Sequence, residues 1–177
     1  MVFLTGRPGI GKTTVLLKII DKLRAEGFNV GGMISREVRE QKIRIGFEII
    51  DISTGKKGWL AYVGQSSGPR IGKYRVNLND LENVGVGAIL NAIKNAEIII
   101  IDEIGPMELL SKLFQEAVLK AINCDKPVIG TIHFRAKHPL ITKLKSTSNI
   151  RIIEVNERNR NKLHEEIANL VIKSLRR

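Results

Sequence analysis

The residues best suited to chemistry lie within the first fourteen positions of the chain, MVFLTGRPGIGKTT. From Gly6 to Thr13 they fit the pattern G-x-x-x-x-G-K-[ST], in which glycines precede a lysine and a hydroxyl residue. Glycine lets the backbone take positive φ and pass close to a ligand, so that successive N–H groups can point at an anion. An apolar run before the loop and an apolar helical pattern after it supply the strand and helix that the motif needs. The segment is therefore predicted to bind a polyphosphate.

The positions of this loop have separate predicted roles. The Lys12 ammonium can reach the β- and γ-phosphates of a nucleoside triphosphate, and the Thr13 hydroxyl can ligate Mg²⁺. The helix that follows adds the positive end of its dipole. We therefore predict nucleotide contacts from one continuous stretch, namely Gly6, Arg7, Pro8, Gly9, Ile10, Gly11, Lys12, Thr13 and Thr14.

A second group of candidate residues follows four consecutive isoleucines. The run Ile98–Ile101 predicts a strand buried on both faces of a parallel sheet. Asp102 and Glu103 end that strand, at the edge where ligands bind in open α/β sheets. Asp102 is predicted to hold Mg²⁺ beside Thr13, and Glu103 to orient the attacking water and accept its proton. The nearby Glu108 is expected to be a solvated helix charge.

Two further candidates lie near the end of a strand predicted over 127–133. Thr131 and His133 fall near its carboxyl end, where either side chain could sense the γ-phosphate or position the water. His133 is also a rival for the role of catalytic base. Glu103 is favoured for that role because of its place in the motif.

Two arginines are candidates for stabilising charge on the transferring phosphoryl group. Arg70 lies in the glycine-rich loop Gly64–Gly72, which could close over a bound nucleotide. Arg160 lies near the start of a helix predicted over Glu157–Leu175, and a guanidinium there could act as an arginine finger. For both arginines a purely structural surface role is the alternative.

Length and composition suit one globular domain, residues 1–177, because 43% of the 177 residues are hydrophobic. No apolar run is long enough to cross a bilayer, and the first strand begins at Val2, so no signal peptide is expected. Cys124 is the only cysteine, which excludes an intrachain disulfide and suits a reducing cytoplasm.

The residue pattern of the region 36–76 differs from that of the rest of the chain. Two β-rich runs surround the polar pair Gln41-Lys42, and a further turn precedes Trp59. We predict a three-layer α/β domain with a mostly parallel central sheet, and an antiparallel hairpin insertion over 36–76, after the second strand.

The whole chain resembles the cancer-related or thermophilic nucleoside-triphosphatase family of P-loop proteins. The resemblance implies a small RecA-like domain that hydrolyses several nucleoside triphosphates with Mg²⁺. It also implies phosphate-loop (Walker A) roles for the first motif and a Walker B role for Ile98, Ile99, Ile100, Ile101, Asp102, Glu103, Ile104 and Gly105. The segments that carry the resemblance are FLTGRPGIGKTT, GGMISREVRE, RIGFEI, IGKYRVNL, IIIIDEIGPMEL, VIGTIH and NERNRNKL.

The resulting prediction is a monomeric, Mg²⁺-dependent nucleoside-triphosphatase. Base selectivity should be loose, because no segment spells a base-specific motif such as N-K-x-D. A nucleotide or small-metabolite kinase is one alternative, since it uses the same loop. A second alternative, motivated by the net charge of +11, is an ATPase stimulated by nucleic acid. Against it, only 5% of residues are aromatic, so side chains on which bases could stack are scarce. A nucleotide-gated switch is a third.

Overall fold

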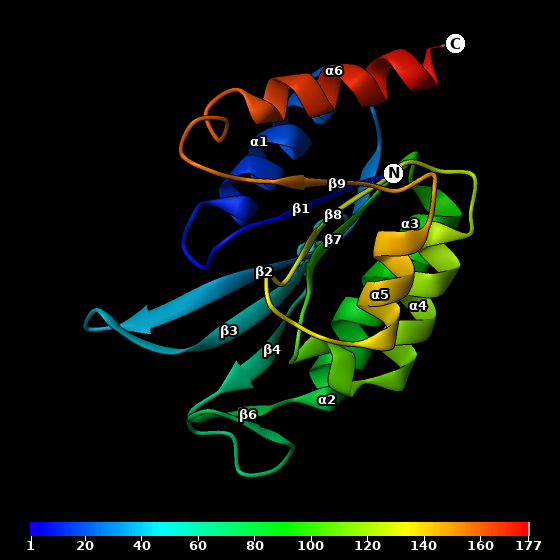
Figure 1. The fold of residues 1–177 in the computed structure, drawn as a ribbon. Helices are drawn as coiled ribbons and strands as arrows, with labels where there is room; N and C mark the ends of the chain where they lie inside the picture. The colour runs from blue at the N-terminus through cyan, green and yellow to red at the C-terminus, as the bar shows by residue number, and fades with distance from the viewer. Residues whose placement is uncertain (177) are drawn as a thin grey trace.

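The computed structural model describes residues 1–176, so the last residue of the predicted domain lies outside the described residues (Figure 1). Its strands form one nine-stranded sheet in the order β5-β6-β4-β3-β2-β7-β8-β1-β9. The strands are β1 Val2–Thr5, β2 Val30–Glu40, β3 Ile43–Asp51, β4 Lys57–Tyr62, β5 Arg70–Ile71, β6 Tyr74–Val76, β7 Ile98–Ile104, β8 Val128–Ile132 and β9 Arg151–Glu154.

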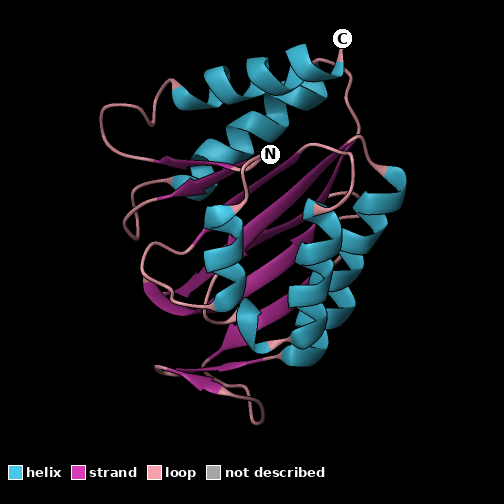
Figure 2. Ribbon diagram, turned by 45° about the vertical axis from the view of Figure 1, so that its right-hand side comes forward, coloured by secondary structure: helices cyan, strands magenta, loops and turns pink. Residues whose placement is uncertain are grey.

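Helices cover both faces of the sheet, which gives the predicted three layers (Figure 2). Buried side chains of α1 and α6 pack in one core, and those of α3, α4 and α5 pack in the other. The helical elements are α1 Lys12–Ala25, α2 Leu78–Asp80, a π-helical turn η1 Leu81–Val86, α3 Gly87–Asn95, a 3-10 turn η2 Glu108–Leu110, α4 Lys112–Ile122, α5 Pro139–Ser146 and α6 Leu163–Leu175. No helix within residues 1–176 is both long and apolar enough to span a bilayer.

The sheet has a parallel half and an antiparallel half. Strands β2, β7, β8, β1 and β9 pair in parallel, as predicted for the nucleotide-binding part. Strands β3, β4, β6 and β5 continue the same sheet through antiparallel pairs, and they form the predicted insertion. Gln41 and Lys42, both at positive φ, make the tight turn between β2 and β3.

The central strand β7 is buried on both faces, as the isoleucine run predicts. Successive side chains of a strand point to opposite faces. Accordingly Ile98 and Ile100 enter the core under α1 and α6, whereas Ile99 and Ile101 enter the other core. Each buried isoleucine stabilises the fold by about 2 kcal/mol relative to an exposed one. The strand is thus a firmly held support for the acidic residues at its end.

The last helix begins later than the sequence predicts. The expected start was Glu157, but α6 begins at Leu163. The Asn156 side chain accepts hydrogen bonds from the backbone N–H groups of Arg158 and Asn159, and Asn159 Nδ2 donates to the carbonyl of Glu154. Such side-chain bonds to the local backbone compete with helix formation. Residues 157–162 therefore form turns.

Candidate active site

The loop after β1 depends on glycine at three positions. Gly6, Gly9 and Gly11 have φ values of +146°, +78° and +105°, which L side chains rarely adopt. At Gly6 there is also no room, because a Cβ would lie 2.7 Å from the carbonyl oxygen of Val155. The loop thus packs directly against the chain that leaves β9.

Helix α1 opens with free N–H groups facing the loop. Its N-cap is Gly11, which offers no capping side chain, and the Val15 N–H is bonded to the Gly11 carbonyl at 2.9 Å. The N–H groups that precede Val15 have no acceptor within the helix, because the first turn of any helix lacks them. Together with the helix dipole they form an anion-binding end.

The Lys12 side chain folds back across this loop. Its Nζ donates a hydrogen bond to the carbonyl of Gly6 at 3.3 Å. Its positive charge acts on two titratable neighbours: burial raises the pKa of Glu103 and Lys12 opposes this rise, whereas burial and then Lys12 lower the pKa of His133. One ammonium therefore lies close to the glycine loop, to the end of β7 and to the residue after β8.

Two threonine hydroxyls hold the carboxylate of Asp102, which is only 1% exposed. Thr13 Oγ1 donates to Oδ2 at 3.1 Å, and Thr131 Oγ1 donates to Oδ1 at 2.6 Å. Burial, together with the charge of Glu103, raises the pKa of Asp102 to about 6, although the bonds from Thr131, Thr13 and the Ser35 backbone act against this rise. Thr131 thus holds the Asp102 carboxylate in place. The sequence did not indicate this contact.

The donor set fits Mg²⁺. A hydroxyl from Thr13 and a carboxylate from Asp102 are the hard oxygen ligands that this ion prefers. Within the described part of the chain, no three His, Cys, Asp or Glu side chains are grouped to hold a metal. This is the pattern expected where nucleotide phosphates and water complete the coordination.

Glu103 is better placed than His133 to accept a proton. Its Oε1 is buried without a hydrogen-bond partner among residues 1–176, and burial raises its pKa. Burial and the Lys12 charge lower the pKa of His133, and its Nδ1 accepts the Arg135 N–H at 3.3 Å. The proton of the neutral ring, inferred from this bond, is then on Nε2, so the imidazole faces the site as a donor.

The two candidate arginines lie apart from one another. Arg70 is on β5 at the opposite end of the strand order from β1, and its Nε donates to the Gly72 carbonyl at 3.0 Å. Arg160 is exposed in the turns after β9, the strand that neighbours β1. Of the two, only Arg160 lies on a segment next to the phosphate loop.

Several of the predicted nucleotide-contact residues have side chains in the core. The side chains of Ile98, Ile99, Ile100, Ile101 and Ile104 are fully buried in the two cores. They hold Asp102 at the carboxyl end of the strand. Glu108 also differs from its expectation as a solvated charge, because it is 4% exposed.

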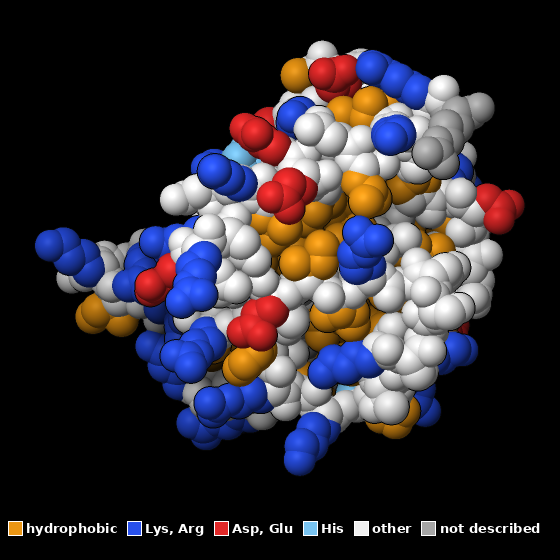
Figure 3. Space-filling view, turned by 45° about the horizontal axis from the view of Figure 1, so that its top comes forward, with side chains coloured by type: hydrophobic (Ala, Val, Ile, Leu, Met, Phe, Trp, Pro, Cys, Tyr) orange, Lys and Arg blue, Asp and Glu red, His pale blue; other side chains and the backbone are white. Residues whose placement is uncertain are grey.

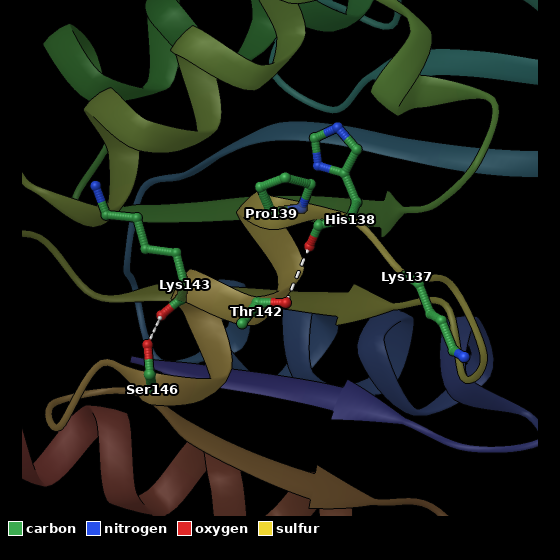
Figure 4. Close-up of a pocket in the computed structure, with 6 residues that line it drawn as sticks. All are labelled: Lys137, His138, Pro139, Thr142, Lys143 and Ser146. Atoms are coloured by element: carbon green, nitrogen blue, oxygen red, sulfur yellow. Dashed lines mark hydrogen bonds between the residues drawn. The ribbon is translucent and has the colours of Figure 1, made fainter.

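A separate surface hollow of about 630 Å³ lies over α5 (Figure 4). None of its lining residues belongs to the phosphate loop or to the acidic strand end; they are Lys137, His138, Pro139, Thr142, Lys143 and Ser146. The hollow therefore adds nothing to the catalytic constellation.

Replacing Thr131 by valine tests its hold on Asp102. Without the hydrogen bond that favours the carboxylate, the pKa of Asp102 should rise above its value of about 6. A protonated acid binds the metal poorly, so the acid limb of kcat/KM should move to higher pH in Thr131→Val. The titration of the nucleotide itself is common to both proteins, so the difference between their profiles reports the protein. An acid limb at the same or lower pH would contradict the assignment.

Comparison with known proteins places the chain in a family. The family described as NTPase matches residues 1–168. The nucleoside-triphosphatase THEP1 of Thermofilum pendens is 49% identical over 173 residues, which cover 95% of each chain. Its counterpart in Methanocaldococcus jannaschii is 43% identical over 175 residues and 99% of each chain.

Two solved structures share the fold over nearly the whole chain. The crystal structure of THEP1 from the hyperthermophile Aquifex aeolicus has a TM-score of 0.85 at 34% identity and covers 97% of this chain and 99% of that one. The solution structure of a human cancer-related nucleoside triphosphatase has a TM-score of 0.82 at 34% identity, with coverage of 98% and 97%. On this sequence and structural similarity, the chain belongs to the nucleoside-triphosphatase (NTPase) family of P-loop proteins.

Proposed function

We propose that this enzyme hydrolyses ATP, GTP and other nucleoside triphosphates to the diphosphate and phosphate, with Mg²⁺ and loose base selectivity. The observation that carries the proposal is the contact between Thr13 and Asp102 at 3.1 Å, beside the glycine loop. This contact joins the two predicted metal ligands, which are 89 positions apart in the chain.

Different residues have separate roles in the proposed reaction. The free N–H groups at the start of α1 and the Lys12 ammonium offset the charge of the polyphosphate. Glu103 orients a water molecule, whose oxygen attacks the γ-phosphorus while the bond from that phosphorus to the β,γ-bridging oxygen breaks. The proton of the water passes to the Glu103 carboxylate. Mg²⁺, held by Thr13 and Asp102, would neutralise charge on the phosphate oxygens.

Hydrolysis is favoured over phosphoryl transfer to a second substrate. A kinase needs an acceptor pocket and usually an arginine-rich lid, for which Gly64–Lys73 is the only candidate segment in the sequence. In the structure Arg70 is on the β5 edge strand, at the far end of the sheet from β1. The lid candidate is thus away from the phosphate loop.

The surface charge gives only limited support to the alternative of an ATPase stimulated by nucleic acid. Lys and Arg side chains gather around the β2–β3 hairpin (Figure 3). The charge of three arginines there is offset in part within the hairpin itself, because they pair with two carboxylates: Arg36 with Glu48, and both Arg39 and Arg44 with Glu37. We therefore expect turnover without a polynucleotide.

Phosphate release from a panel of nucleoside triphosphates tests the proposal. All common substrates should be hydrolysed with kcat/KM values within about tenfold of one another, since no residue pattern reads the base. EDTA should abolish release, and excess Mg²⁺ should restore it. Label passing from the γ-phosphate to an added nucleoside or alcohol would favour a kinase. A many-fold rise in turnover with DNA or RNA, lost steeply with salt, would favour a nucleic-acid-stimulated ATPase.

A further inference from the structure

Glu108 is a buried acid close to the proposed catalytic base. It opens the 3-10 turn η2, five residues after Glu103, and only 4% of its surface is exposed. An acidic side chain is rarely buried so completely, because removal of its charge from water is costly, and here the backbone N–H groups of Glu108 and Gly105 are its hydrogen-bond partners. Its position therefore requires an explanation beyond packing.

Three titratable side chains converge on Gly105. A Cβ built on this glycine would stand 3.1 Å from Glu108 Oε2, 3.4 Å from the Cβ of His133 and 3.6 Å from the Cγ of Glu103. The absence of a side chain at Gly105 thus lets the Glu108 carboxyl pack against the backbone just after the proposed base. Glu103, Glu108 and His133 thus all lie beside Gly105.

The turn that carries Glu108 is held at several points. The Leu109 N–H donates to the Gly105 carbonyl at 3.0 Å, and the Ser111 N–H donates to the Glu108 carbonyl at 3.1 Å. Gln115 Nε2 donates to the Leu109 carbonyl at 2.8 Å. Because these bonds fix the backbone, the Glu108 carboxyl is directed inward.

The surroundings of Glu108 disfavour its charged form. Burial and then the charge of Glu103 raise its pKa to about 8; Asp102 adds to this rise, and backbone amides of Glu108 and Gly105 act against it. Lys12, in contrast, favours the charged form of Glu103. Neighbouring carboxylates cannot all ionise cheaply, which adds to the cost of charge on Glu108.

We propose that Glu108 is a positioning residue for hydrolysis, whose carboxyl fills the space beside Gly105 and holds Glu103 toward the attacking water. The inference rests on the proposed role of Glu103. It assigns Glu108 no contact with the nucleotide, so its loss affects the catalytic step and spares nucleotide binding.

Variants of different shape and charge separate the explanations. Glu108→Ala should lower kcat about tenfold or more and leave KM within about twofold, because the base loses its orientation. Glu108→Gln, which has the same shape and no charge, should keep kcat close to that of the unchanged enzyme. Glu116→Ala, an exposed acid of α4, is the matched control. Equal loss in Glu108→Gln and Glu108→Ala, or no loss in either, would overturn the proposal.

A double-mutant cycle tests whether Glu108 acts through Glu103. In a Glu103→Gln background, Glu108→Ala should have little further effect on kcat, whereas independent effects would multiply and overturn the inference. If Glu108→Ala does not fold, Glu108→Asp, which withdraws the carboxyl by one methylene, takes its place with the same expected loss. If Glu103→Gln itself hydrolyses normally, the proposed function fails. If only the Glu108 variants are normal, this inference alone fails.

Discussion

Glu103→Gln should retain nucleotide binding and lose hydrolysis by about 10² or more, the scale of general-base catalysis. Glutamine keeps the shape of the side chain and removes its ability to accept a proton. The binding site should stay intact, because the proposed phosphate contacts come from Lys12 and the N–H groups of the loop. Single-turnover phosphate release gives the rate, and titration with a fluorescent nucleotide gives the affinity.

Two variants serve as references for this experiment. Glu116→Gln, on the exposed face of α4, should leave both quantities unchanged. His133→Ala should lower the rate less than Glu103→Gln, because the structure leaves the imidazole as a donor. If His133→Ala were the inactive enzyme and Glu103→Gln the active one, the base would be misassigned.

Lys12→Ala should lower kcat/KM by roughly a hundredfold or more, because a charge-assisted contact to the phosphates contributes about 3 kcal/mol. Lys12 Nζ already lies across the loop at 3.3 Å from the Gly6 carbonyl, so the ammonium has a short path to a bound phosphate. Steady-state phosphate release measures the loss. Lys12→Arg should also be impaired, since the planar guanidinium does not replace a compact ammonium.

Lys18→Ala provides the matched control for this change. Lys18 is an exposed residue on the same helix, and its loss should leave kcat/KM unchanged. Normal kinetics in Lys12→Ala would remove the phosphate-loop assignment altogether. Equal losses in both variants would point to a general effect of charge on substrate attraction.

The parts of the site that depend on local sequence were predictable. Glycine spacing and the apolar run of β7 identify the loop and the acidic strand end without knowledge of the fold. That Thr13 and Asp102 lie together follows from a further rule, since parallel strands present their carboxyl ends at one edge. Their nearness also depends on the strand order, in which β8 alone separates β7 from β1.

The parts that depend on packing were not predictable. The burial of Glu108 is decided by the turn after Gly105, and its sequence is equally compatible with an exposed helix start. The hold of Thr131 on Asp102 depends on the register between β7 and β8. The late start of α6 follows from asparagine side chains that bond to their own backbone, an effect that apolar periodicity does not report.

The position of β1 inside the sheet has a consequence for the synthesis of the chain. This strand is made first, yet its neighbours are β8, from Val128 to Ile132, and β9, from Arg151 to Glu154. The carbonyl of Val155 also lies against Gly6. During synthesis, β1 therefore cannot pair with its neighbouring strands until most of the polypeptide has left the ribosome. We therefore expect nucleotide binding only after β9 has been made, because shorter nascent chains lack the strand that holds the phosphate loop in place.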